Sequence, residues 1–405
     1  MHDEKIVFSD IVVDKDDEIH DVKFHGKSGE YFKIWIVNLF LTVLTLGIYS
    51  AWAAVRKRRY FYGNTDIGGS HFDYHAVPLN LLLSRIIVIA FILLYVLSGL
   101  IHPILQLGIL LILFILSPYF ILRAWRFNTL MSSFRNIRFN YHCRFAQGYW
   151  VILVMPFLLI TMLVIAVIAG GTSATLMRCS GPGGCDATAS FIQGIIQMMI
   201  ILAGMFLVFA VQAKRIYDLF FNQLFYGKQP FAIQSELKKF LQFYVIAVLI
   251  LLPFICLGGS IMWQMMMTVA MANYYQMTVS PVSFAVNVVS MYLIFLCGLI
   301  VTSAYLRVAV IRYVSAHVSL GNMLRFRSDI SLFPYLMLVF TNSLMVIFTL
   351  GFATPVAQIR HARYMAENMK IIGDMSLATV SAHDENKAGA VQDEIVSAFD
   401  IGVSL

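Results

Sequence analysis

The sequence contains little charge. Only 13% of its 405 residues are Asp, Glu, Lys or Arg, whereas 60% are hydrophobic. An average soluble domain has about 25% charged and about 45–50% apolar residues. The composition therefore excludes an ordinary soluble enzyme, a disordered tail protein and a small disulfide scaffold. The hydrophobic excess lies in runs of about 20 residues, the length that crosses a bilayer, so we expect an all-α, polytopic integral membrane protein.

Signatures of catalysis and nucleotide binding are also missing. The sequence has no Walker loop, no nucleophile elbow and no His-Glu-x-x-His motif. No Asp or Glu falls in the core of an expected span, which argues against proton or sodium coupling through a buried carboxylate. His71, Asp73, His75 and His142 lack a diagnostic metal-ligand spacing. We therefore expect no enzyme activity, no bound metal and no other cofactor.

Eight apolar segments are candidates for membrane insertion, and helices are expected because lipid leaves irregular backbone unpaired. The candidate segments are 31–55, 79–101, 104–122, 149–169, 190–212, 240–259, 282–306 and 333–356. They divide the chain into an N-terminal tail (1–30), a membrane domain (31–373) and a C-terminal tail (374–405). The expected fold is a helical bundle of six to eight membrane segments.

The charges are segregated along the chain. Residues 1–30 hold nine acidic and four basic residues, and residues 374–405 hold six acidic and one basic, so each tail carries −5. The remaining 24 basic and 7 acidic residues give the middle +17. The basic residues lie in short loops between apolar runs, which is the pattern of loops kept in the cytoplasm. This pattern predicts that the basic loops face the cytoplasm, and it predicts no nucleic-acid partner.

Cysteine is scarce and mostly scattered. Of the five cysteines, only Cys179 and Cys185 lie close together, in a Gly- and Pro-rich loop on the side without basic residues. A small disulfide in an oxidising periplasm is the favoured reading of this pair, with two free thiols as the alternative.

An internal repeat links the two ends of the membrane domain, at about 31–78 and 335–370. Nine of 27 positions are identical between 38–64 and 342–368 at an offset of 304. The identities include Asn38/Asn342, Thr45/Thr349, Leu46/Leu350, Gly47/Gly351, Arg56/Arg360, Arg59/Arg363, Tyr60/Tyr364 and Asn64/Asn368. A weaker echo pairs Phe72-Asp-Tyr-His75 with Phe139-Asn-Tyr-His142. The Gly pairs and alternation of 64–74 also favour a small β-turn or hairpin.

The repeat leaves two topologies open. If 31–55 and 333–356 both cross the membrane, they form an inverted repeat of the kind found in transporters. That arrangement places Arg360 and Arg363 in the periplasm, against the positive-inside bias. If both segments are instead broken and re-enter on the cytoplasmic side, all basic clusters and both acidic tails face the cytoplasm around six full spans.

The motifs resemble one known family. Thr45-Leu-Gly-Ile-Tyr49, Trp52, Arg56-x-x-Arg59-Tyr60 and Phe72-x-Tyr74 are similar to the YjgN-like family of bacterial inner-membrane proteins, a domain of unknown function. The resemblance covers nearly the whole chain except the acidic ends. It implies a multi-pass inner-membrane protein and carries over no catalytic or ligand residues.

Two groups of residues are candidate sites. One is a polar group that could line a passage or join helices: Asn38, Thr45, Gly47, Asn342, Thr349 and Gly351. The other could bind anionic lipid headgroups: Arg56, Arg59, Arg360 and Arg363. The expected function is transport, a channel or lipid handling, and the alternative is a non-catalytic envelope scaffold or assembly partner. A polar cavity at the first group would favour transport, and a sealed apolar interior would favour a scaffold.

Overall fold

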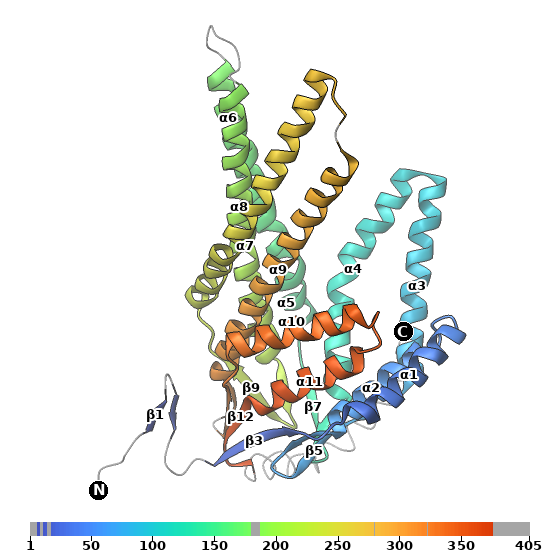
Figure 1. Cartoon of the computed structure of the whole chain (residues 1–405). Coiled ribbons are helices and arrows are strands. Elements are labelled where there is room, and N and C mark those ends of the chain that lie inside the picture. The colour runs from blue at the N-terminus through green and yellow to red at the C-terminus, as the bar shows by residue number, and fades with distance from the viewer. Residues whose placement is uncertain are drawn as a thin grey trace.

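The computed structural model describes the backbone of residues 6–8, 11–13, 18–179, 187–278, 280–321 and 323–375. Within these ranges the side chains of residues 6–13 and 171–195 are not described. The chain combines a β-barrel with helical hairpins that project from it (Figure 1). Strands β1 (Ile6–Phe8) and β2 (Ile11–Val13) form a separate two-stranded sheet.

Ten short antiparallel strands close into a barrel, so the expectation of an all-α protein is wrong. The strands are β3 (Ile19–Phe24), β4 (Thr65–Ile67), β5 (Ser70–Tyr74), β6 (Ser132–Phe134), β7 (Ile137–Tyr141), β8 (Leu224–Tyr226), β9 (Gln229–Ile233), β10 (Val318–Leu320), β11 (Leu324–Ser328) and β12 (Met369–Gly373). They follow one another around the ring in sequence order. Closing the ring leaves no unpaired sheet edge.

The two ends of the domain complete the barrel. Strand β12 pairs with β3, with Lys370 opposite Asp21 and Ile372 opposite Ile19. The other barrel strands form four hairpins, β4–β5, β6–β7, β8–β9 and β10–β11. The expected hairpin at 64–74 is confirmed as β4–β5. Its turn places Gly68 and Gly69 at positive φ of 56° and 78°, as a tight two-residue hairpin turn requires.

Aromatic side chains fill the barrel. Alternate residues of β3 and β9 are buried, and the rings of Phe72 and Phe134 lie 4.8 Å apart between centroids. The rings of Phe139 and Tyr226 lie 5.2 Å apart, and the ring of Phe231 lies 6.4 Å from that of Phe139. Such ring pairs add about 0.5–1.5 kcal/mol each beyond the area they bury. The barrel is thus a packed core and not an open tube.

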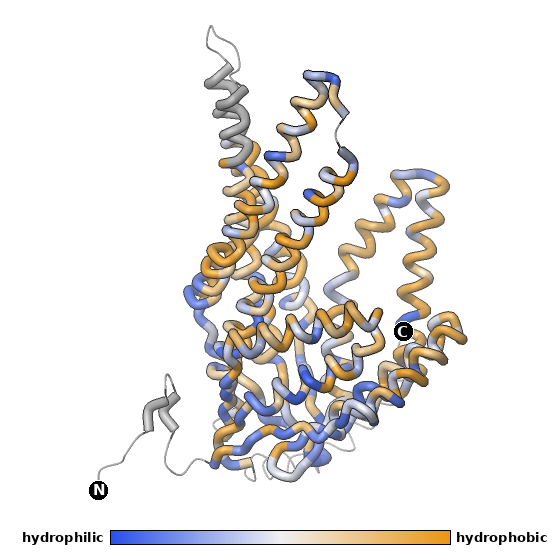
Figure 2. Tube along the Cα trace, viewed as in Figure 1, coloured by the Kyte–Doolittle hydropathy of each residue, from blue (hydrophilic) through white to orange (hydrophobic). Residues whose placement is uncertain are grey.

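Three long helical hairpins project from the barrel in one direction (Figure 1). They are α3 (Pro78–Ile101) with α4 (Pro103–Leu130), α6 (Met155–Cys179) with α7 (Ala187–Phe221), and α8 (Leu237–Tyr275) with α9 (Pro281–His317). A short helix α5 (Phe145–Tyr149) and a π-helical turn η1 (Trp150–Val154) lead directly into α6. Six described helices are long and apolar enough to cross a membrane, and Figure 2 shows that hydrophobic residues predominate along the coloured parts of the long helices.

Two short helical hairpins stay close to the barrel (Figure 1). The first is α1 (Ser28–Leu44) with α2 (Ser50–Gly63), and the second is α10 (Leu332–Phe348) with α11 (Thr354–Glu367). The expected segments 31–55 and 333–356 are therefore each interrupted by a turn. Their first helices have 17 residues each, or roughly 25 Å at 1.5 Å per residue, short of the bilayer core of about 30 Å.

Candidate functional site

The turns of the two short hairpins have the same geometry. Leu46 and Gly47 adopt φ of 50° and 93°, and Leu350 and Gly351 adopt the same two values. Thr45 Oγ1 donates to the Leu41 carbonyl at 2.7 Å and accepts from Tyr49 N at 2.9 Å. Thr349 makes the equivalent bonds to Met345 and Ala353 at the same distances. These threonines and glycines therefore reverse the chain.

The asparagines predicted to line a passage make hydrogen bonds within their own hairpins. Arg56 Nη1 lies 3.5 Å from Asn38 Oδ1, and Arg360 Nη1 donates to Asn342 Oδ1 at 2.9 Å. Asn342 Nδ2 also donates to the Ala357 carbonyl at 3.2 Å. Each asparagine thus ties the first helix of its hairpin to the second. Neither asparagine lines the hollow at α4–α6 or the hollow at α5–α7.

The second arginine of each motif holds the end of a strand. Arg59 donates to the carbonyl of Tyr74, the last residue of β5, and to that of Ala76 just after it, both at 3.2 Å. Arg363 donates to the carbonyl of Gly26, just beyond β3, also at 3.2 Å. Of the four candidate headgroup arginines, Arg59 and Arg363 therefore join helices to strand ends of the barrel, and the side chains of all four are exposed.

The two short hairpins also contact each other. Tyr31 is buried and donates from its hydroxyl to Gln358 Oε1 at 2.9 Å. Burial, with a smaller contribution from Tyr60, raises the pKa of Tyr31 to about 12. The ring of Trp35 meets Phe352 at 6.4 Å. The first and last hairpins of the chain thus close the circle of helices above the barrel.

The turns of these hairpins expose large apolar side chains. Leu46 is 95% exposed and Leu350 is 90% exposed. Their neighbours Val43, Leu44, Ile347 and Phe348 are also exposed. Apolar side chains gathered on an exposed surface mark contact with lipid or with another protein.

The histidines do not form a site. His75 Nε2 lies 2.7 Å from Ser133 Oγ in the neighbouring strand, and His142 packs its ring on Phe225. Among the residues that the structure describes, no group of three or more His, Cys, Asp or Glu could hold a metal ion. The predicted disulfide of Cys179 and Cys185 lies outside the described side chains.

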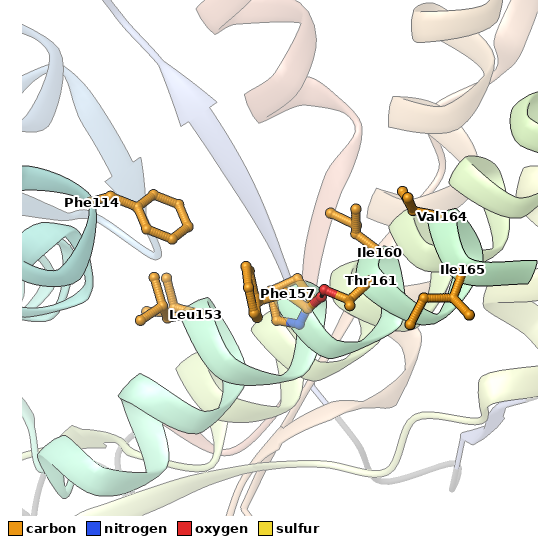
Figure 3. A pocket seen from close by; sticks show the side chains of 9 residues that line it. Phe114, Leu153, Phe157, Ile160, Thr161, Val164 and Ile165 are labelled. Carbon is orange, nitrogen blue, oxygen red and sulfur yellow. Dashed lines mark hydrogen bonds between the residues drawn. The ribbon is translucent and has the colours of Figure 1, made fainter. Parts of the chain in front are cut away.

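A hollow opens between two of the long hairpins. Its volume is about 320 Å³, and it lies between α4 and the η1–α6 segment (Figure 3). It is lined by Phe114 of α4 and by Ile152, Leu153, Pro156, Phe157, Ile160, Thr161, Val164 and Ile165. We call this hollow the α4–α6 cleft. Sequence reasoning missed it, because the facing residue Phe114 belongs to another span and all lining residues look like ordinary lipid-facing side chains.

The π-helical turn η1 shapes the side of the cleft formed by α6. Pro156 has no N–H, so one carbonyl in the preceding turn lacks its helical donor. Gln212 of α7 supplies a replacement and donates from Nε2 to the Val151 carbonyl at 2.9 Å. A π-helical turn inside a long helix is frequently found at functional sites.

A second hollow of about 470 Å³ lies where α5 and η1 meet α7. It is more polar and includes Gln147, Trp150, Arg215 and Asp218. Asp218 accepts from Lys214 Nζ at 2.5 Å and also accepts from the Ser235 hydroxyl. Its carboxylate is thereby held by the chain itself.

Comparison with known proteins places the chain. Residues 19–398 match the model of a family described as "Bacterial protein of unknown function (DUF898)". The chain belongs to this family. Three curated relatives are named "Inner membrane protein YjgN", which confirms the predicted resemblance to YjgN-like proteins. One from Salmonella typhimurium is 27% identical over 377 residues, 91% of this chain and 92% of that protein. One from Escherichia coli K12 is 24% identical, covering 90% and 92%. No solved structure matches.

The DUF898 assignment agrees with the architecture. The match begins at the first residue of β3 and extends beyond β12, so it includes the complete barrel and all helical hairpins. Together with the six apolar helices, the relatives identify the chain as a multi-pass inner-membrane protein.

Proposed function

We propose that this DUF898 chain is a non-catalytic lipid-handling protein, which takes up bilayer lipids between hairpins that are held apart by the barrel. The α4–α6 cleft supports this proposal. It lies between two candidate spans and carries almost only apolar side chains. An acyl chain that leaves the bilayer for the cleft moves between two apolar surroundings, so van der Waals packing against these side chains, and not transfer from water, holds it there.

A lipid-handling function fits better than passage of a solute through the barrel. The barrel interior is filled with aromatic rings that lie about 5–6.5 Å apart. The polar residues predicted to line a passage are hydrogen-bonded inside the short hairpins. Of the two described hollows, the α4–α6 cleft has the more apolar lining, and we propose that it opens toward the bilayer.

We further propose that the barrel lies on the cytoplasmic side and that both short hairpins enter one leaflet without crossing. The basic turns lie at the barrel end of the spans, which matches the positive-inside bias. The exposed Leu46 and Leu350 mark the ends of the short hairpins. In this orientation those side chains are buried in hydrocarbon, which is favourable.

We also infer that 31–78 and 335–370 are copies of one ancestral unit. Beyond the shared turns, several hydrogen bonds recur at the offset of 304. Tyr60 Oη donates to the Lys27 carbonyl, as Tyr364 Oη does to that of Ser331. Asn64 Nδ2 donates to the Tyr60 carbonyl, as Asn368 Nδ2 does to that of Tyr364. His25 N donates to the Asn64 carbonyl, as Asp329 N does to that of Asn368.

Lipid profiling of a strain lacking the chain tests the function. We expect deletion to change the phospholipid profile while uptake of a broad solute panel is unchanged. Expression of the wild type and of Leu158→Trp, a substitution on α6 outside the cleft, should restore the profile. Ile160→Trp, which fills the cleft, should not. An unchanged lipid profile with altered solute uptake would overturn the proposal in favour of solute transport.

A second candidate function is an envelope scaffold. The long helices leave most of their apolar faces exposed, including Ile92 and Leu97 of α3 and Leu293 of α9. Faces of this kind can also receive the helices of a protein partner. Chemical crosslinking in intact membranes distinguishes the two functions. A stable stoichiometric partner that the cleft-filling variant still binds would favour the scaffold.

A further inference from the structure

We propose that the α4–α6 cleft is a site for an anionic phospholipid, with one acyl chain in the cleft and the phosphate at Arg123 and Arg144. This rests on the proposed lipid-handling function and names the lipid class. The inference combines the length of the cleft, its closed end and the charge around that end.

The cleft has the length of one leaflet. Its lining on η1 and α6 runs from Ile152 to Ile165. Fourteen helical residues extend roughly 20 Å, and one leaflet of hydrocarbon is about 15 Å deep. A single acyl chain can therefore lie along Leu153, Phe157 and Ile160 and face Phe114, as Figure 3 shows for the side chains.

The cleft is closed at its barrel end. There α4 and α5 pack so closely that a Cβ on Gly148 would lie 2.2 Å from Leu122 Cδ1. Next to this contact the rings of Tyr119 and Phe145 stack at 5.7 Å. The apolar lining ends at this packing, and in the proposed orientation this end of the cleft lies at the cytoplasmic surface, where the headgroup of a lipid in the cleft lies.

Positive charge surrounds the closed end. Arg123 lies next to Leu122 in α4 and donates to Tyr119 Oη at 2.7 Å, which holds its guanidinium beside the Tyr119–Phe145 stack. Arg144 directly precedes Phe145 and is exposed. Arg126 follows one turn after Arg123. A guanidinium can bind phosphate oxygens with two parallel hydrogen bonds.

The segment that carries these arginines contains no carboxylate of its own, and Asp218 of α7, in the neighbouring hollow, is already held by Lys214 and Ser235. Between Asp73 and Asp186 the sequence contains no Asp or Glu at all. The same stretch carries the arginines Arg85, Arg123, Arg126, Arg135, Arg138, Arg144 and Arg178. Each basic residue near a membrane surface attracts anionic lipid by about 1 kcal/mol. A zwitterionic lipid brings its own ammonium group to the arginines and gains less, so the cleft favours a net negative headgroup.

Native mass spectrometry of the full chain tests the site. The protein is equilibrated with an equimolar mixture of phosphatidylglycerol and phosphatidylethanolamine, and the bound lipids are counted. We expect phosphatidylglycerol to be enriched several-fold on the wild type. Arg123→Gln combined with Arg144→Gln should reduce the enrichment to near one. Lys23→Gln with Lys228→Gln, which removes two charges from exposed barrel positions, should leave it unchanged.

Blocking the cleft tests whether the acyl chain of the lipid lies in it. Ile160→Trp should lower the number of tightly bound lipids of both classes, whereas Leu158→Trp on the same helix should not. Thermal unfolding of each variant identifies any that fail to fold, and the arginine and lysine pairs then serve as the test. Equal binding of the two lipids to the wild type, or equal enrichment on both charge variants, would overturn this site. Altered phospholipids in the deletion strain would still support lipid handling, so the two failures are distinguishable.

Discussion

At the scale of residues, several charged side chains in this protein join neighbouring elements through ion pairs and hydrogen bonds. Asp329, just after β11, accepts from Arg327 Nε at 2.8 Å and pairs with Lys370 Nζ of β12 at 3.1 Å. Burial alone would raise the pKa of this carboxyl, but the hydrogen bonds from Lys370 and Arg327 outweigh it and lower the pKa. The ion pairs join neighbouring strands near the seam where the ends of the domain meet.

Asp329 is expected to make stability depend on acid pH. A carboxyl whose pKa is lowered by folding stabilises the protein above its unfolded value, about 4, and the gain disappears as pH falls through the folded value. Because the group is partly exposed, Asp329→Asn should cost only about 0.5–1 kcal/mol at pH 7. Thermal unfolding at pH 7 and pH 3 should show that the difference from wild type shrinks in acid. An equal difference at both pH values would contradict this role.

Gly373 is expected to be the least replaceable glycine of the barrel. It adopts φ of 123°, and a Cβ there would lie 2.1 Å from the backbone oxygen of Met323. Gly373→Ala should therefore destabilise the chain by at least about 2 kcal/mol. Gly351→Ala, at φ of 93° but with open space around it, should cost only the backbone strain of about 1 kcal/mol. Similar losses of thermal stability for the two variants would contradict the close packing of β11 and β12.

At the scale of elements, hydrophobic length predicted the long helices well. Six of the eight expected segments overlap the six long helices, because a run of about 20 apolar residues has few other solutions in lipid. The strands were mostly missed, since they have three to six residues each and lie among basic residues that also satisfy the positive-inside pattern. The two stretches of the weaker echo, 72–75 and 139–142, overlap β5 and β7, each the second strand of its hairpin.

The barrel itself could not be predicted from local pattern. Its closure pairs β12 with β3, two strands separated by nearly the whole chain, and no local periodicity encodes that contact. The candidate site had the same difficulty. Asn38 and Arg56 were both singled out, but their mutual contact depends on the reversal at Gly47. The cleft depends on how α4 packs against the α5–α6 segment, where Gly148 lies close to Leu122.

The π-helical turn is expected to depend on Gln212. Replacing it with Leu removes the donor to the Val151 carbonyl and leaves an unpaired oxygen in the span. Such a loss costs about 1–3 kcal/mol. Gln212→Leu should therefore lower the thermal midpoint, whereas Gln264→Leu on α8, whose side chain is exposed, should not. An unchanged midpoint for Gln212→Leu would show that water or a relaxed helix satisfies Val151.

The proposed orientation of the short hairpins predicts a labelling pattern. Cysteines placed at His20 and Glu385 should be protected from a membrane-impermeant thiol reagent applied to the periplasmic side and should react after the membrane is opened. A cysteine at Leu46 should stay poorly reactive in both conditions because hydrocarbon surrounds it. These variants are made in a background without the five native cysteines. Periplasmic labelling of both His20→Cys and Glu385→Cys would reverse the proposed topology.

At the scale of the whole molecule, the barrel is the rigid part to which separate membrane hairpins are fixed. The hydrogen bonds of Arg59 and Arg363 and the pairing of β12 with β3 hold the short hairpins on the barrel. The long hairpins extend away from it (Figure 1). The helices α4 and α5 are in close contact at Gly148, and the cleft lies farther from the barrel, between α4 and α6. A filled barrel and a cleft open to the bilayer together support lipid handling over solute passage.

Photocrosslinking with a phospholipid that carries a diazirine on its acyl chain tests the central claim most directly. The full chain is reconstituted with this lipid, irradiated and digested, and the modified residues are identified by mass spectrometry. We predict adducts concentrated at Phe114, Leu153, Phe157 and Ile160, with few at the equally lipid-facing Leu158 and Ile92. Adducts spread evenly over all exposed span residues would contradict a lipid site in the cleft.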